Sequence, residues 1–380
     1  MIISIGILAW NEAECIAGTV RSLLEQSLIQ TLQSSNDWRV EVIVVPNGCT
    51  DDTAAQAVAA LDQGAQSLPD GVLTWRVESV AEPGKVNAWN LFVHRFSHPQ
   101  ADYVFLMDAD IRLGHPDTLQ NMVHALEQNA HASVAVDVPR KHIAAKTWKS
   151  LADRISLAIS GITQAAPGQL TGQLYCARGP LLRCVHMPLG LLVEDGFLKQ
   201  MLCTDLLRQP CDNSRVICAP DATHVFEAYT GLNDIFLNQR RQQIGHAVYT
   251  YLRDYLRERV GEKNAGEIIA ENNARDPDWF RALIQERMRQ SGLWVMYPGA
   301  FSVRWRRLRN LSTRHALVRV PIAMVAFLLD IPVLIAANHR LKTGQLAGVW
   351  KDTKSTALDQ AAAAAPDVQS LPDSSRSMSP

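Results

Sequence analysis

Apolar runs alternate with amphipathic stretches over the first part of the chain. The apolar runs are nearly continuous and cover residues 2–9, 40–45, 72–77 and 103–107, of which 72–77 is the weakest. Runs of this length predict strands that are buried on both faces. The stretch after the first run has helical spacing at Ile16, Val20, Leu23 and Leu24. Because strand and helix alternate four times, we predict a parallel sheet covered by helices.

The second part of the chain is less regular. Its pattern predicts a helix from Pro116, a strand over 132–138, a helix over 146–162, a helix from about 236 and a helix over 279–290. A polar stretch over 261–278 separates the last two helices. The alternation of strand and helix is thus lost, and the C-terminal third is predicted to be mainly helical.

The strand predicted over 103–107 leads directly into two carboxylates, Asp108 and Asp110. Ligands of open α/β sheets bind at this end of the strands. Two neighbouring carboxylates need a compensating cation, and Mg²⁺ or Mn²⁺ prefers carboxylate and phosphate oxygens. The pattern therefore favours a divalent metal that holds a diphosphate. A solvated turn, or a helix N-cap formed by Asp110, is the simpler alternative.

Polar residues also follow the other predicted strands. They are Asn11 and Glu12 after the first, Asn47 and Asp51 after the second, and Lys85 at the start of a helix after the third. In a parallel sheet these positions line one edge. Loops are polar in any protein, but this succession favours a shared nucleotide site. The sequence contains neither GxGxxG nor GxxxxGK[ST], which argues against a dinucleotide oxidoreductase and a P-loop enzyme.

A second acidic pair, Glu194-Asp195, follows the apolar run at 189–193. A carboxylate at such a place can take the proton of an attacking hydroxyl, so Asp195 is the candidate general base. Acidic residues in the first turn of a helix are also favoured by the helix dipole. The two interpretations are compatible.

Composition limits the classes of partner and location. The formal net charge is −1, which gives no support for nucleic-acid binding. The seven cysteines lack metal-type spacing and are read as reduced thiols of a cytosolic protein. The apolar N-terminus has no basic flank and is too short for a signal peptide, so we read it as a strand.

The order of these motifs resembles the family 2 type glycosyltransferases, which are inverting enzymes of GT-A fold. The matching pieces lie at 5–12, 44–53, 84–90, 108–110, 194–195 and 236–243. The resemblance covers roughly residues 1–245, and the order and spacing of the pieces make it specific. It implies an α/β fold of GT-A type, with a mainly parallel nucleotide-binding sheet flanked by helices and a helical C-terminal extension.

The resemblance also implies residue roles. Asp195 would be the catalytic base, and Asp108 and Asp110 would bind Mg²⁺ or Mn²⁺. The donor and its diphosphate would contact Ala9, Asn11, Glu12, Asn47, Asp51, Lys85, Asp108, Glu194, Gln239, Arg240 and Arg241. The implied reaction moves a hexosyl group from a nucleoside-diphosphate sugar to a hydroxyl of a saccharide or lipid-linked acceptor.

Two motifs depart from the family pattern. Many relatives have Asp-Asp-Gly-Ser where this chain has Pro46-Asn47-Gly48-Cys49, which leaves the base of the nucleotide open. The stretch Gln239-Arg240-Arg241-Gln242-Gln243 lacks the Trp of processive synthases, so the addition of a single sugar is favoured. His224 is a candidate extra metal ligand, but a lone strand histidine is more often structural.

The apolar stretch 317–337 follows a basic run with Arg304, Arg306, Arg307 and Arg309. Within it Arg319 and Asp330 fall on one helical face, which favours a helix in the membrane interface over one that crosses the bilayer. A buried helix with a salt bridge and a true span remain alternatives. The basic run suits anionic lipid headgroups or an anionic lipid-linked acceptor.

We therefore predict a glycosyltransferase domain over 1–235, a helical region over 236–350 that is membrane-interfacial at 304–340, and a disordered tail over 357–380. The predicted location is cytoplasmic, with a peripheral site on the inner membrane if the interface helix forms. The context would be surface polysaccharide or glycolipid synthesis. Two rival functions are a nucleotidyltransferase on a similar fold and a non-catalytic nucleotide-sugar binding protein.

Overall fold

The fold is known from a computed structural model. It describes residues 1–30, 38–68, 73–146, 148–149, 168–228, 232–302 and 313–344. The helix predicted over 146–162, most of the basic run after 303 and the tail lie outside these residues. The strands are β1 (Ile2–Ala9), β2 (Arg39–Pro46), β3 (Leu73–Val77), β4 (Tyr103–Asp108), β5 (Ile111–Leu113), β6 (Val134–Lys141), β7 (Leu174–Arg178) and β8 (Val216–Phe226).

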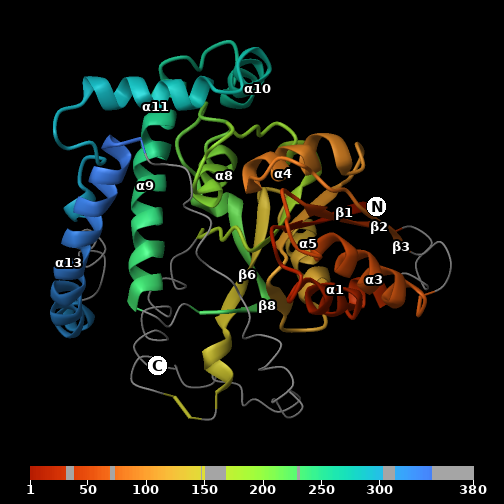
Figure 1. Ribbon diagram of the computed structural model, residues 1–380. Helices are drawn as coiled ribbons and strands as arrows, with labels where there is room; N and C mark the ends of the chain where they lie inside the picture. The colour runs from red at the N-terminus through yellow and green to blue at the C-terminus, as the bar shows by residue number, and fades with distance from the viewer. Residues whose placement is uncertain are drawn as a thin grey trace.

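Helices cover both faces of these strands (Figure 1). Those of the first part are α1 (Ile16–Leu24), α2 (Ser27–Gln30), α3 (Thr53–Ala65), α4 (Lys85–Leu91) and α5 (Thr118–Gln128). Those of the second part are α7 (Gly179–Leu182), α8 (Glu194–Cys203), α9 (Leu232–Arg257), α10 (Ala265–Arg275), α11 (Trp279–Gln290) and α13 (Thr313–Lys342). Short π or 3-10 turns are η2 (Phe92–Phe96), η3 (His142–Ala145), η4 (Asn213–Arg215) and η5 (Ala300–Ser302).

The described strands form one sheet in the order β3-β2-β1-β4-β7-β6-β8-β5. Strands β3, β2, β1 and β4 are mutually parallel, as the alternation of strand and helix predicts. Strand β7 then lies antiparallel between β4 and β6, and β8 is parallel to β6. The β7 strand thus enters the sheet from the edge at which β4 ends, which brings a second loop to that edge.

Alternate residues of the central strands pack on opposite faces of the sheet. Phe105 joins a core cluster with α1, α3 and α5, whereas Val104 and Leu106 join a cluster with α4, α8 and α9. Burial on both faces explains why these strands have continuous apolar runs rather than alternating ones. The second cluster contains residues of the sheet and of the C-terminal helices together. The domain boundary at 235 stays a prediction.

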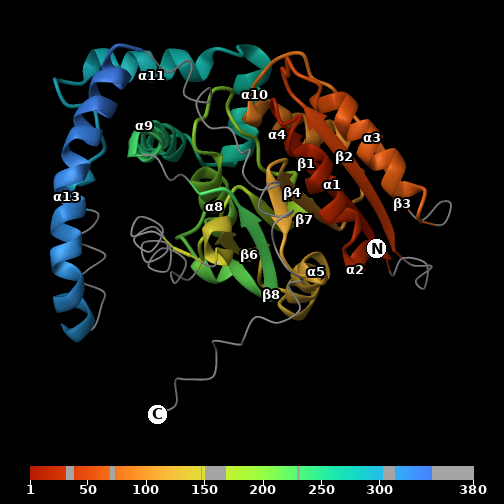
Figure 2. The ribbon, with the colours of Figure 1, turned by 60° about the horizontal axis from the view of Figure 1, so that its bottom comes forward.

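The C-terminal helices form a layer beside the sheet (Figures 1 and 2). Helix α9 lies along α13, and α10 and α11 cross one end of α9. The polar stretch over 261–278, for which no helix was predicted, contains α10 over most of its length. Helix α10 begins with a capping box in which Asn264 and Glu267 exchange side-chain and backbone hydrogen bonds.

Helix α13 contains the apolar stretch 317–337. None of the helices described is both long and apolar enough to cross a membrane. Leu334, Ala337 and Leu341 of α13 are buried against the rest of the protein, while Met324, Leu328 and Ile335 are more than half exposed. The side chain of Arg319 lies outside the described residues, so its predicted pairing with Asp330 stays untested.

Candidate active site

The ends of β1 and β2 are joined by a network of side-chain to backbone hydrogen bonds. The Asn47 amide Nδ2 donates to the Ala9 carbonyl at 2.7 Å, and its Oδ1 accepts from the Gly84 amide at 3.0 Å. The Asn11 side chain accepts from the Thr50 amide at 2.7 Å, and Asn11 has a φ of 55°, a conformation that Asn tolerates better than most residues. Asn11 and Asn47, which were both predicted to contact the nucleoside, therefore fix the loops that would face it.

Asp51 has a similar local role. Its carboxylate accepts from the Thr53 amide and hydroxyl at 3.1 and 2.5 Å and from the Ala13 amide at 3.2 Å. Partial burial opposes ionisation, but these hydrogen bonds outweigh it and lower the pKa of Asp51. The neighbouring Glu12 amide donates a further hydrogen bond to the Thr53 hydroxyl at 2.8 Å. Hydrogen bonds within the protein thus hold this edge of the sheet in place.

The two acidic pairs meet at Lys85, the first residue of α4. Its Nζ lies 2.6 Å from Asp108 Oδ1 at the end of β4 and 2.8 Å from Glu194 Oε1 at the start of α8. The three side chains are only 18%, 21% and 11% exposed. Lys85 also donates to the Gly172 carbonyl at 3.3 Å. The cluster joins three motifs that are far apart in the sequence.

Helix α4 holds this cluster in place through residues on its inner face. The Trp89 indole donates to the Tyr175 hydroxyl at 2.6 Å, and Asn90 exchanges hydrogen bonds with the Met187 backbone at 2.8 and 3.1 Å. Tyr175 lies in β7, and Met187 precedes the loop that leads to Glu194. The spacing of Lys85, Trp89 and Asn90 thus fixes β7 and that loop around the acidic pairs.

Negative charge exceeds positive charge in the cluster. Burial opposes the charge of Lys85, but Asp108 and Glu194 outweigh it and raise its pKa. Burial would raise the pKa of Glu194, but Lys85 outweighs this and holds that pKa below its usual value. Burial raises the pKa of Asp108 by more than the Lys85 charge lowers it. Together with the nearby Asp110 carboxylate, burial brings the pKa of Asp108 to about 7. One ammonium therefore does not fully compensate the carboxylates.

Asp195, the candidate base, lies in the first turn of α8. Burial and the adjacent Glu194 carboxylate raise the pKa of Asp195 to about 6. A carboxylate whose pKa is raised in this way is a better proton acceptor at neutral pH than an exposed carboxylate. Its Oδ1 accepts from the Gly196 amide at 2.7 Å, which holds the side chain in position.

The loop before β7 packs against this acid pair, although no role was predicted for that loop. A Cβ added to Gly172 would lie 3.0 Å from Glu194 Oε1 and 3.4 Å from the Asp195 Cβ, so a larger residue would push the pair aside. The Thr171 hydroxyl is buried without a hydrogen-bond partner among the described residues. The glycine-rich composition of 168–172 was the available signal in the sequence.

Among the predicted diphosphate contacts, Arg241 is near enough to act on the acidic pair. Its charge contributes to lowering the pKa of both Glu194 and Asp195. Arg240 instead packs against the Phe236 ring, with Cζ 6.0 Å from the ring centroid. Gln239 lies on the same helix, α9, and is partly buried.

The alternative of Asp110 as a helix N-cap is wrong, because the strand β5 follows it. His224 is fully buried, with Nδ1 2.6 Å from Asp137 Oδ2 and Nε2 3.3 Å from Gln173 Oε1. These contacts on both ring nitrogens favour the structural interpretation of His224.

The donor atoms suit a hard cation that shares its coordination with a phosphate. Within the described part of the chain, no group of three or more His, Cys, Asp or Glu side chains is arranged to hold a metal by itself. Asp108 and Asp110 supply carboxylate oxygens in a site with excess negative charge. Mg²⁺ is commonly held by one or two carboxylates together with substrate phosphates. The residues therefore fit the predicted Mg²⁺ or Mn²⁺.

Comparison with known proteins agrees with this geometry. Residues 4–186 match the family model described as glycosyl transferase family 2. This match confirms the resemblance seen in the motifs, and with it the α/β fold of GT-A type. The N-terminal part of the chain, residues 4–186, is thus similar to glycosyl transferase family 2, a class of nucleotide-sugar glycosyltransferases.

Several solved structures resemble the chain more distantly. It is similar to a mannosyltransferase from Pyrobaculum calidifontis in complex with GDP-mannose and Mn²⁺, with 18% identity and a TM-score of 0.48 over 92% of this chain and 88% of that one. It is also similar to the glucosyl-3-phosphoglycerate synthase of Mycobacterium tuberculosis in complex with Mg²⁺ and UDP, with 19% identity and a TM-score of 0.42 over 66% of this chain and 78% of that one. A search of curated proteins gave no match.

Proposed function

We propose that the protein transfers a hexosyl group from a nucleoside-diphosphate sugar to an acceptor hydroxyl with inversion at the anomeric carbon. The observation that carries this proposal is the Lys85 cluster, which joins the Asp108 and Glu194 motifs within 2.8 Å of one ammonium. The Asp108 motif, which we assign to the diphosphate, and the Glu194-Asp195 motif, which holds the proposed base, thus lie beside one another. The family match supports the reaction class, and the geometry supports the assignment of roles.

The reaction needs one proton acceptor and one leaving-group site. The acceptor hydroxyl loses its proton to the Asp195 carboxylate while its oxygen bonds to the anomeric carbon. The bond from that carbon to the β-phosphate oxygen breaks, and the nucleoside diphosphate leaves with the electron pair. Glu194 would stay paired with Lys85, so the proposal assigns no carboxylate as the nucleophile of a second displacement. A single displacement inverts the configuration.

The donor would lie along the edge formed by the β1, β2 and β4 ends. The loops fixed by Asn11, Asn47 and Asp51 would present backbone groups to the nucleoside, with Ala9 and Glu12 at the same edge. Lys85, Gln239, Arg240 and Arg241 would face the diphosphate. A cation held by Asp108 and Asp110 would neutralise charge on the departing diphosphate.

Donor binding is expected to depend on the metal. At a ligand concentration 100 times above Kd, binding should stabilise the protein by roughly 2.7 kcal/mol. Thermal unfolding is measured with UDP, GDP and their sugars, with and without Mn²⁺. We expect at least one nucleotide to raise Tm only in the presence of Mn²⁺, and Asp110→Asn to remove that increase.

Asp117, at the start of α5 and with a side chain that is 46% exposed, provides the control Asp117→Asn, which should behave like the native protein. Metal-independent shifts for every nucleotide would refute the metal assignment. Release of pyrophosphate from a nucleoside triphosphate, without transfer from any nucleotide sugar, would instead establish the rival nucleotidyltransferase.

Helix α13 supports a peripheral membrane site. Met324, Leu328 and Ile335 are 53%, 64% and 57% exposed, and their spacing places them within about 40° on one face of the helix. The sequence from 303 to 319, which leads into the helix, contains six arginines and no acidic residue. An apolar face next to a basic segment suits an anionic lipid surface. Such a location would fit a lipid-linked acceptor and a role in glycolipid or surface polysaccharide synthesis.

We therefore expect the protein to sediment with vesicles that contain anionic lipid and not with purely zwitterionic ones. The triple variant Met324→Gln, Leu328→Gln and Ile335→Gln should weaken this binding at least about tenfold, since each apolar side chain contributes on the order of 1 kcal/mol at partial burial. The variant Val58→Gln changes an exposed apolar residue of α3 and should sediment like the native protein.

Equal sedimentation of the native protein and the triple variant would contradict the lipid assignment. Light scattering tests whether a second copy of the chain, rather than a lipid surface, covers this face of α13. A native dimer that becomes a monomer in the triple variant, without vesicle binding, would show that a second copy of the chain covers α13.

A further inference from the structure

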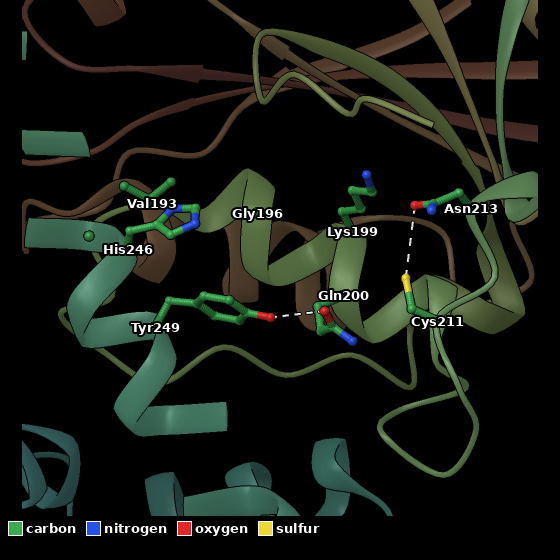
Figure 3. A pocket seen from close by; sticks show the side chains of 9 residues that line it. Val193, Gly196, Lys199, Gln200, Cys211, Asn213, His246 and Tyr249 are labelled. Carbon is green, nitrogen blue, oxygen red and sulfur yellow. Dashed lines mark hydrogen bonds between the residues drawn. The ribbon is translucent and has the colours of Figure 1, made fainter. Parts of the chain in front are cut away.

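A cavity of about 240 Å³ lies between α8 and α9, beside the candidate base. Its lining comes from α8, α9 and the segment before η4: Val193, Gly196, Lys199, Gln200, Cys211, Asn213, Gly245, His246 and Tyr249. Figure 3 shows these side chains around the space. Val193 and Gly196 flank the acid pair in sequence, so the cavity begins within one helical turn of Asp195.

The cavity combines an apolar and aromatic wall with hydrogen-bond donors. Val193 and the ring of Tyr249 provide the wall. The Tyr249 hydroxyl donates to Gln200 Oε1 at 3.0 Å, which fixes the orientation of the Gln200 amide. The amide nitrogen Nε2 of Gln200 is buried and has no hydrogen-bond partner among the described residues. A buried donor of this kind is expected to meet an acceptor atom.

The charge of the lining is positive. None of the nine residues is acidic, and Lys199 is the one lysine or arginine among them. Lys199 follows Asp195 by four residues in α8, so the two side chains lie on the same side of the helix, about 6 Å apart along its axis. If an anionic group of an acceptor molecule bound Lys199, the neighbouring atoms of that molecule would therefore lie near Asp195.

Gly196 keeps this space open. A Cβ added there would meet no atom within 4 Å, so packing does not demand a glycine. Glycine in a helix is less favourable than alanine by about 0.8–1 kcal/mol. A larger side chain would project into the cavity, since Gly196 is part of its lining. Free space next to a candidate base is a sufficient reason for glycine here.

We propose that this cavity is the acceptor subsite and that it selects a sugar unit bearing a carboxylate or a phosphate. The inference rests on the proposed transferase function. The anionic group would bind Lys199 and Gln200 Nε2, the ring would pack on Tyr249, and a hydroxyl of the same unit would reach Asp195. At roughly 30 Å³ per water, the space holds about eight waters, which suits one sugar unit rather than a chain.

The experiment measures direct binding of three probes to the full-length protein by ligand-observed NMR. The probes are methyl glucuronide, glucose 6-phosphate and the neutral methyl glucoside, so that carboxylate and phosphate are distinguished. We expect at least one anionic probe to bind at least tenfold more tightly than the neutral one. Lys199→Met should remove that difference, and Gly196→Leu should weaken binding of every probe that binds the native protein.

The matched control is Lys263→Met, because Lys263 is an exposed lysine that pairs with Glu271 in another part of the protein. It should leave the binding of all probes unchanged. Gly196→Ala is a second steric variant that should fold at least as well as the native protein and weaken binding less than Gly196→Leu does.

Three results would overturn the proposal. They are an absence of binding by both anionic probes, equal affinity for the neutral probe, and an unchanged preference in Lys199→Met. Nucleotide binding is measured in the same native sample. If the native protein bound no nucleotide, that result would contradict the transferase function. The probe results concern the cavity alone.

Discussion

Replacing Asp195 by asparagine is expected to lower the rate of sugar transfer by about 10² to 10⁴, the usual contribution of a general base. Asparagine is nearly isosteric and can still accept the Gly196 amide hydrogen bond, so donor binding should persist. The rates are measured with a radiolabelled nucleotide sugar under single-turnover conditions, and donor binding is measured by thermal shift. The control Asp254→Asn, on the exposed side of α9, should retain native rates.

The pH dependence provides an independent check of the same assignment. Asp195 acts as a base only when it is ionised, and burial and Glu194 raise its pKa to about 6. For the native protein, kcat/KM should therefore rise as pH increases through about 6 and level off above it. The residual activity of Asp195→Asn should lack this rise. Full activity in the variant, or an unchanged pH profile, would assign the base to another residue.

Replacing Lys85 by methionine is expected to reduce the free energy of unfolding by about 3 kcal/mol, because it leaves the largely buried Asp108 and Glu194 carboxylates without their cation. Urea unfolding at neutral pH measures the loss. The double variant Lys85→Met/Glu194→Gln should recover part of it, since one uncompensated charge is removed. The control Lys263→Met breaks an exposed pair and should change stability by less than about 1 kcal/mol.

The sign of the pH effect distinguishes this explanation from a simple loss of packing. In the native protein Lys85 holds the pKa of Glu194 below its usual value, so that stabilisation is present above the unfolded pKa and is lost as pH falls through the folded one. Without Lys85, burial is the largest remaining influence on Glu194, and it raises the pKa of that carboxyl. The deficit of Lys85→Met should therefore shrink as pH is lowered from about 7 to 5. A deficit that does not change with pH would indicate a packing defect.

The sequence predicted β1, β2 and β4 because their apolar runs are buried on both faces, which gives a clear pattern. Strand β3 lies at the edge of the sheet and is only partly buried, so its run was weaker. It missed α10 because only a few apolar residues interrupt its polar composition, with Ile268 and Ile269 buried on one side. The capping box at Asn264 and Glu267 was the local signal that marks its start. A short helix of this kind depends more on tertiary contacts than on its own periodicity.

The sequence located the acidic motifs and Lys85 but not the connection among them. No local sequence pattern indicates that Lys85 lies between Asp108 and Glu194, because both contacts depend on the packing of α4, β4 and α8. The same limit applies to Asn11 and Asn47, which were predicted to contact the nucleoside. Both amides are hydrogen-bonded to neighbouring backbone, and only the folded loops reveal this.

The antiparallel placement of β7 has a consequence for how the chain folds. Strand β4 pairs with β1 on one side, which the first part of the chain can supply, and with β7 on the other, which comes from much later. Until β7 arrives, β4 is an apolar edge strand, and such edges tend to pair with other chains. Contacts between distant segments form slowly. The newly synthesised segment up to β4 therefore depends on later segments for protection against aggregation, as well as for Glu194 and Asp195.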